Sequence, residues 1–180
     1  MIFIFHLIFS GKERNLNIIE VSCSNCGKFF HESCIGYQMG KLLSFSMNYV
    51  FTCKFCSSTG LEIYRRNSSS LHQMCITTLA NLQRKTVKDG NPRFVFSKDR
   101  EIIPFIESYW ESITTQARKQ TTAWYSTILK TLQTHSNIFS SQEVNGELLF
   151  GLIETDLETI KPNYEKLVKD EGNFRARRFE

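Results

Sequence analysis

The sequence predicts an α+β protein in two parts, a small cysteine-rich module followed by a helix-rich domain. Five of the six cysteines lie between Cys23 and Cys56, so cysteine chemistry is confined to the first part. The composition changes at SSTG (57–60) and again at RRNSSS (65–70), where polar residues mark a boundary. Beyond this boundary, apolar side chains recur at helical spacing. With 41% hydrophobic residues and only three prolines, the 180-residue chain is typical of a globular protein.

The composition divides the chain into four segments. We expect an atypical apolar N-terminus at 1–10, the cysteine-rich module at 11–66, the helix-rich domain at 67–165 and a basic tail or linker at 166–180. The opening MIFIFHLIFS is too short to span a bilayer and lacks the features of a signal peptide. We therefore expect a reducing compartment and no membrane partner. The net charge of +4 permits an acidic partner such as nucleic acid without requiring one.

The helix-rich domain begins with a capping signal. Asn67 and the serines after it can cap a helix whose apolar residues repeat at helical spacing. These residues are Leu71, Met74, Cys75, Leu79 and Leu82. Cys75 is thus expected in the core rather than with the other cysteines. The turn cluster KDGNP (88–92) ends the helix, and the alternation in RFVFS (93–97) predicts a short strand.

Two further helices are separated by a polar connector. The first should run from about residue 99 or 103 to 113, with Pro104 accommodated only in its first turn. The connector covers 114–122, and the next helix spans 121–135. Each helix carries one of the two tryptophans on its apolar face, so we expect both in the core rather than in an aromatic cage.

A β-hairpin completes the domain. NIFS (137–140) and ELLFGLI (147–153) read as its strands, and DLETI (156–160) as a short closing helix. The resulting order of helix, strand, helix, helix and hairpin is that of a winged-helix domain, in which the hairpin is the wing. Other small α+β domains share parts of this order.

The two CxxC pairs, Cys23/Cys26 and Cys53/Cys56, together supply four thiolates. A zinc ion binds four such ligands in a tetrahedron, and each tight CxxC turn supplies two of them. A reducing compartment disfavours the alternative of a disulfide framework, and no βαβ pattern supports a redox thiol pair. The sequence therefore predicts a Zn²⁺ site that stabilises a module too small to fold well alone.

His31 and Cys34 form half of a second site. The full order, C-x2-C-x4-H-x2-C-x18-C-x2-C, resembles the last six ligands of a PHD finger. A RING finger, a class of ubiquitin ligase, would place the histidine second among these six rather than third. The PHD resemblance implies that the two CxxC pairs share one zinc and that the half-site needs a first pair upstream. His6 is the only conventional ligand there, so we expect the chain to be an incomplete version of a longer protein.

Longer motifs carry a more specific resemblance. They are GKERNLNIIEV, FFHESCIGYQMGKL, FTCKFCSSTGLE, HQMCITTLANLQ, FSKDREIIPFIESYWESITT, WYSTILKTL and GLIETDLETIKPNYE. Over about residues 11–165 they make the chain similar to the absent, small or homeotic discs family. This is a family of trithorax-group chromatin proteins with an atypical PHD finger followed by a winged helix.

The resemblance implies a non-catalytic nuclear adaptor that binds DNA and regulates transcription. It also implies zinc as cofactor, and as partners the other subunits of a trithorax/COMPASS-type complex that methylates lysine four of histone H3. The family's first zinc pair and its SPRY domain are missing, so we expect DNA contact rather than methyltransferase stimulation from this chain. No nucleophile motif or phosphate-binding glycine loop indicates an enzyme. A histone-tail reader and a RING-like ubiquitin ligase remain as alternatives.

Phosphate contacts require lysine and arginine, aided by hydroxyl groups. The candidates are Arg118, Lys119, Lys130, Thr127 and Thr131, with Arg93 and Lys98 as weaker ones. The first two lie in the connector, and the next three are expected on the third helix, away from its apolar stripe. This helix has few Arg, Asn and Gln side chains to read bases, so we expect weak sequence preference and marked salt dependence.

Overall fold

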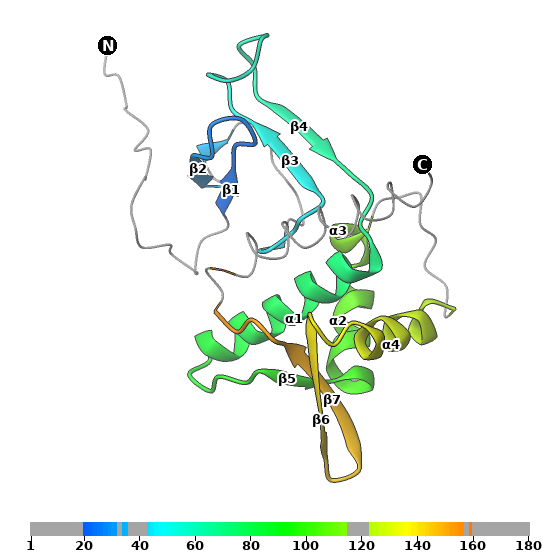
Figure 1. The fold of residues 1–180 in the computed structure, drawn as a ribbon. Coiled ribbons are helices and arrows are strands. Elements are labelled where there is room, and N and C mark those ends of the chain that lie inside the picture. The colour runs from blue at the N-terminus through cyan, green and yellow to red at the C-terminus, as the bar shows by residue number, and fades with distance from the viewer. Residues whose placement is uncertain (1–19, 32–33, 36–42, 115–122, 157–158, 160–180) are drawn as a thin grey trace.

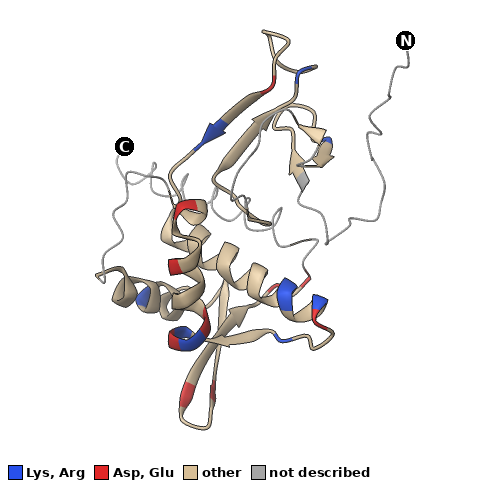
Figure 2. Cartoon of the chain, turned by 180° about the vertical axis from the view of Figure 1, so that it is seen from behind, with Lys and Arg blue, Asp and Glu red and all other residues tan. Residues whose placement is uncertain are grey.

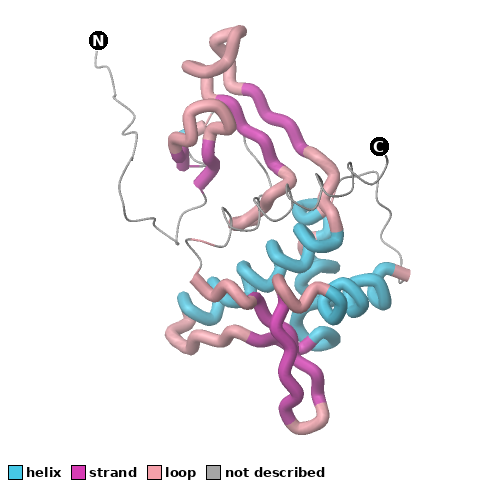
Figure 3. The backbone as a smooth tube through the Cα atoms, in the orientation of Figure 1, coloured by secondary structure: helices cyan, strands magenta, loops and turns pink. Residues whose placement is uncertain are grey.

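The chain forms a small β-rich upper lobe above a lower lobe of helices and one sheet (Figures 1 and 3). The computed structural model describes residues 20–31, 34–35, 43–114, 123–156 and 159. The apolar N-terminus and most of the expected closing helix lie outside this described part. None of the helices within it is long and apolar enough to cross a membrane.

Two antiparallel hairpins make up the upper lobe. β1 (Glu20–Ser22) pairs with β2 (Phe29–His31), and β3 (Tyr49–Thr52) pairs with β4 (Ile63–Arg66). The small core between them consists of Val21, Cys23, Ile35, Phe51 and Cys53. Two of these core residues are cysteines, so the lobe buries too little apolar surface to be stable without a further cross-link.

The lower lobe is built around α1 (Leu71–Lys88), which begins at a capping box. The Ser70 hydroxyl accepts a hydrogen bond from the Gln73 N–H at 3.2 Å, and the Gln73 side chain accepts one from the Ser70 N–H at 2.9 Å. Residues 74–81 are buried without interruption, because other elements cover α1 on several sides. Cys75 is fully buried, as predicted.

The single helix expected up to Ile113 is wrong, because three pieces take its place. A π-helix at Lys98–Ile102 leads into α2 (Ile103–Ser108), and α3 (Trp110–Ile113) follows. The break is at Tyr109, whose φ of −114° and ψ of 24° lie outside the α-helical region. The break reorients the chain, so that α3 continues with its tryptophan in the core.

A three-stranded antiparallel sheet has the order β5–β7–β6. Its strands are β5 (Val95–Ser97), β6 (Phe139–Val144) and β7 (Glu147–Leu152). Asn145 and Gly146 form a two-residue turn with φ values of 51° and 77°, and such a turn continues the twist of both strands. The polar SQEV segment therefore belongs to β6 rather than to a loop, and the wing is longer than predicted.

α4 (Trp124–Thr134) packs against α1 and closes the lower core. Both tryptophans are there, as predicted, with Trp110 and Trp124 ring centroids 5.3 Å apart. The most deeply buried residues of this core include Met74, Ile76, Phe96, Ile106, Ile128, Leu132 and Phe150. The helix order and the projecting β6–β7 hairpin are those of a winged helix (Figure 1).

A linking segment, residues 43–48, leads into β3 of the upper lobe and packs against the lower lobe. Its apolar side chains pack against the lower core. Thr77 of α1 donates its hydroxyl to the Phe45 carbonyl at 3.2 Å, and the Asn81 amide donates to the Ser44 carbonyl at 2.7 Å. Phe45 has a φ of 62°, a rare conformation for a bulky residue, so surrounding contacts hold it in place. The lobes therefore share packing as well as a covalent connection.

Candidate metal centre and nucleic-acid surface

The four predicted cysteines come together between the two hairpins. The sulfurs of Cys23, Cys26, Cys53 and Cys56 all lie within 4.8 Å of one another. The Cys26 and Cys53 sulfurs are 4.0 Å apart. A tetrahedral zinc ion with Zn–S bonds of about 2.3 Å would hold its sulfurs about 3.8 Å apart. The donor set and its spacing therefore fit zinc.

Two tight turns present these sulfurs. After β1, the Gly27 N–H donates to the Cys23 carbonyl at 2.9 Å, and Gly27 adopts a φ of +68° that favours glycine. After β3, the Cys56 N–H donates to the Cys53 carbonyl at 3.0 Å. The turns are held side by side because the Ser24 N–H donates to the Phe51 carbonyl at 2.8 Å. Residues far apart in sequence thus form one preorganised cluster.

The surroundings of the sulfurs shift the pKa values of Cys23 and Cys56 in opposite directions. Burial raises the pKa of the Cys23 thiol, but N–H groups directed at its sulfur, including that of Cys53 at 3.3 Å, outweigh burial and lower it to about 6. Hydrogen bonds with the Cys26 and Cys53 side chains raise the pKa of Cys56 to about 12. The Cys23 thiolate therefore forms readily, whereas Cys56 retains its proton at neutral pH. A divalent cation would favour the thiolate form of all four sulfurs.

The predicted half-site also comes together. The His31 Nδ1 atom and the Cys34 sulfur are 3.9 Å apart. Within the described residues, no other histidine, cysteine or carboxylate joins them to make a group of three. His6, the upstream candidate, lies outside those residues. Within the described part of the chain, the half-site therefore has two of the four ligands that a structural zinc requires.

The exposed face of α4 carries part of the predicted DNA surface. Lys130 and Thr127 are exposed, and Figure 2 shows one blue segment on α4. The expectation that Thr131 also points away from the core is wrong. It is only 6% exposed, and its hydroxyl donates to the Thr127 carbonyl at 2.9 Å. Arg118 and Lys119 lie outside the described residues.

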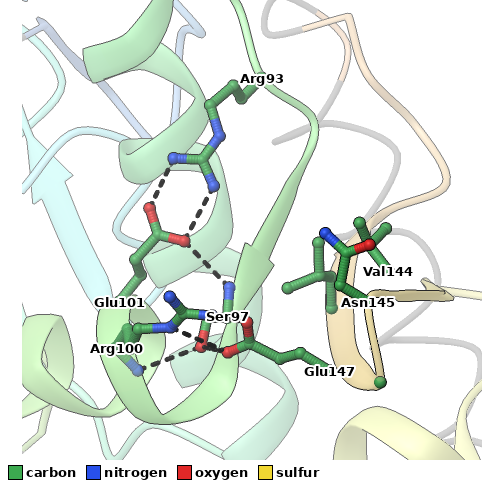
Figure 4. Close-up of a pocket in the computed structure, with 9 residues that line it drawn as sticks. Arg93, Ser97, Arg100, Glu101, Val144, Asn145 and Glu147 are labelled. Atoms are coloured by element: carbon green, nitrogen blue, oxygen red, sulfur yellow. Dashed lines mark hydrogen bonds and ion pairs between the residues drawn. The ribbon is translucent and has the colours of Figure 1, made fainter.

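The two weaker candidates already have carboxylate partners. Arg93 donates two hydrogen bonds to Glu101, at 2.8 and 2.9 Å (Figure 4). Burial raises the pKa of Glu101, but this pairing outweighs it and lowers the pKa. Lys98 lies 2.9 Å from Asp99. Each side chain would have to leave its carboxylate partner to contact a phosphate, which makes both of them weaker candidates than an unpaired cation.

Sequence reasoning missed a charged pocket between the wing and the π-helix (Figure 4). Its volume is about 610 Å³. Glu147 of the wing accepts hydrogen bonds from Arg100 Nε at 3.1 Å and from the Ser97 hydroxyl at 2.5 Å. Arginines and glutamates neutralise one another here, so the pocket does not favour an anion. The pairing of β5 with β7 brings the arginines and glutamates of the pocket together, and no local sequence motif indicates this pairing.

Comparisons with known proteins match both lobes. Residues 14–66 match the family model for the ASH2 PHD zinc finger. Residues 68–165 match the winged-helix (WH) model of the Set1/Ash2 histone methyltransferase complex subunit ASH2-like. These matches confirm the predicted fold class, a PHD-type finger followed by a winged helix.

Curated relatives and a solved structure agree with these two family matches. The chain is 46% identical over 165 residues to the Set1/Ash2 histone methyltransferase complex subunit ASH2 of Drosophila melanogaster, which covers 89% of this chain and 30% of that protein. It is 29% identical to the Set1 complex component ash2 of Schizosaccharomyces pombe, over 75% of this chain and 23% of that protein. The PHD2 and winged-helix domain of Polycomblike, at 23% identity, shares the fold with a TM-score of 0.66 over 83% of this chain and 77% of that chain. This chain thus spans less than a third of the length of these two curated relatives.

Proposed function

The chain belongs to the ASH2-like family of Set1/Ash2 histone methyltransferase complex subunits, and from this we propose that it is a non-catalytic chromatin adaptor. In this proposal it works in the nucleus, binds DNA through its winged helix and regulates transcription. Its protein partners are the other subunits of a complex that methylates lysine four of histone H3. Family membership supports the complex, and the winged helix supports the DNA contact.

The observation that carries DNA binding is the exposed cation on α4. Lys130 has no carboxylate partner among the described residues, whereas Arg93, Lys98 and Arg100 are all paired. We place the contact on Lys130 and Thr127 of α4, together with Arg118 and Lys119 in the connector before it. Few base-reading side chains accompany them, so phosphate contacts should dominate the affinity.

Zinc would be held by Cys23, Cys26, Cys53 and Cys56. Four protein ligands leave no open position for a substrate, which is the pattern of a structural rather than a catalytic zinc site. When bound, the ion supplies the cross-link that the small core of the upper lobe lacks. The site therefore supports an adaptor role and adds no reaction chemistry.

Replacing Lys130 with alanine should weaken DNA binding uniformly across sequences. The loss of one phosphate contact should make the plot of log affinity against log salt concentration less steep, reducing the magnitude of its negative slope by about 0.9. Fluorescence anisotropy with two unrelated duplexes, titrated at several salt concentrations, measures this slope. Lys88→Ala is the matched control, because Lys88 is also an exposed helical lysine of the lower lobe but lies at the end of α1. Equal losses in both variants would mean diffuse attraction and contradict the assigned surface.

Separate titrations of DNA and of histone H3 tail peptides test the proposal as a whole. We expect salt-dependent DNA binding and no comparable peptide affinity. Tight peptide binding without DNA affinity would instead favour a histone-tail reader. The PHD family match favours an adaptor over a RING-like ligase, and discharge of ubiquitin from a charged conjugating enzyme would reverse that preference.

A further inference from the structure

The outer side of β4 carries exposed residues on either side of Tyr64. Tyr64 of β4 turns inward, where its ring stacks on Phe51 with centroids 5.3 Å apart. Alternation along the strand places the residues on either side of Tyr64 on the opposite, outer face. There, Ile63 is 42% exposed and Arg65 is exposed, and Leu61, two residues before the start of β4, is 71% exposed. We call these three residues the outer row.

The outer row lies at the outer edge of the β3–β4 sheet. β3 pairs with β4 on one side and bridges to Cys23 on the other, so β3 is the inner strand. Figure 1 shows β4 on the side of the hairpin away from β1 and β2. Among the described residues, no strand pairs with the free edge of β4. Such an edge offers backbone N–H and C=O groups to an added strand.

The charges next to this edge favour an acidic partner. Arg65 has no carboxylate partner among the described residues, and Figure 2 shows blue on β4. The nearby acid, Glu62, points to the other face, where it accepts a hydrogen bond from the Tyr64 hydroxyl. A strand added to β4 would place alternate side chains beside Leu61, Ile63 and Arg65. Apolar residues suit the first two neighbours, and a carboxylate suits the third.

We propose that the β4 edge is a docking site for an extended protein segment in which apolar and acidic residues alternate with polar ones. The segment adds as a third strand to the β3–β4 sheet. Its backbone pairs with β4, its apolar side chains cover Leu61 and Ile63, and its carboxylate binds Arg65. This surface is separate from α4, so a partner and DNA can be held by the two lobes at once.

A defined peptide tests the proposal on the whole zinc-loaded chain. The probe is a labelled heptapeptide, ETVTVTE, whose palindromic sequence offers a carboxylate to Arg65 in either strand direction. Binding is followed by fluorescence anisotropy. A second copy of the peptide carries an N-methyl group on every backbone nitrogen, which removes the hydrogen-bond donors along both of its edges and prevents strand addition in either direction. Zinc content checks that the upper lobe of each variant is folded, and tryptophan fluorescence checks the lower lobe.

Arg65→Glu should weaken binding of ETVTVTE at least tenfold and should strengthen binding of the charge-reversed peptide KTVTVTK. The matched control is Lys28→Glu, which reverses another exposed charge of the upper lobe, in the turn between β1 and β2. The control should bind like the unaltered chain, and the N-methylated peptide should not bind. No binding of ETVTVTE, equal affinities of the two variants, or full binding of the N-methylated peptide would each overturn the proposal.

Discussion

The Cys53→Ser variant will lose its zinc and the fold of its upper lobe. Cys53 is buried between the hairpins, where its sulfur lies 4.0 Å from that of Cys26. A structural zinc contributes roughly 10–16 kcal/mol of binding free energy in zinc-finger peptides. Removing one of its four ligands forfeits much of that energy. The small core that remains cannot hold β1–β4 together.

Metal content and lobe-specific signals measure this result. Mass spectrometry should find one zinc per chain in the unaltered protein and less in the variant, with loss of the amide signals of β1–β4 in NMR spectra. Cys34→Ser is the matched control, because Cys34 is exposed and lies outside the four-sulfur cluster. The control should keep its zinc. Retention of zinc by Cys53→Ser, or a fold unaffected by a strong chelator, would contradict the four-cysteine site.

Zinc loss should also weaken the lower lobe. The linking segment 43–48 leads directly into β3, and its apolar residues complete the lower core. If β3 loses its partners, the hydrogen bonds of Thr77 and Asn81 to this segment lose their support. Both tryptophans are in the lower lobe, so their fluorescence reports this lobe alone. We expect chelation to lower the melting temperature recorded by tryptophan fluorescence.

Local patterns in the sequence are sufficient to predict the metal cluster and the helices α1 and α4. A CxxC turn needs only its own residues to aim two sulfurs, and apolar periodicity locates α1 and α4. The same periodicity places Thr131 on the buried face, because it follows Trp124 by seven residues and Ile128 by three. Its assignment to the DNA surface was therefore an avoidable error. The Asn145–Gly146 pair likewise predicts a tight hairpin turn, and hence a longer wing.

Other features depend on tertiary contacts that no local pattern reveals. The break at Tyr109 follows from packing, since nothing in IESYWES interrupts a helical pattern. The ion pair of Arg100 with Glu147 joins residues on two different elements. The linking segment is a further example, because its contacts with α1 join residues 32 and 37 positions apart. These contacts decide which cations have carboxylate partners and how the two lobes pack together.

Alanine in place of Gly151 should severely destabilise the winged helix. Gly151 lies in β7, the central strand, between Val95 of β5 and Ser140 of β6. A Cβ atom there would lie 2.0 Å from the Phe94 carbonyl oxygen. That oxygen belongs to the backbone just before β5, so relief of the clash requires the two strands to separate. We expect a loss of about 3 kcal/mol or more in the free energy of unfolding, at the upper end of overpacking effects.

The clash acts on the sheet that anchors the wing, so it should also disturb the core packing behind that sheet. Separating β5 from β7 disturbs Phe96 and Phe150, which are paired in register and fully buried. Urea unfolding followed by tryptophan fluorescence measures the loss in the zinc-loaded chain. Ser141→Ala, on the exposed part of β6, is the control and should change the free energy of unfolding by less than about 0.5 kcal/mol. If Gly151→Ala were as stable as this control, β5 and β7 could not be packed as closely as the structure has them.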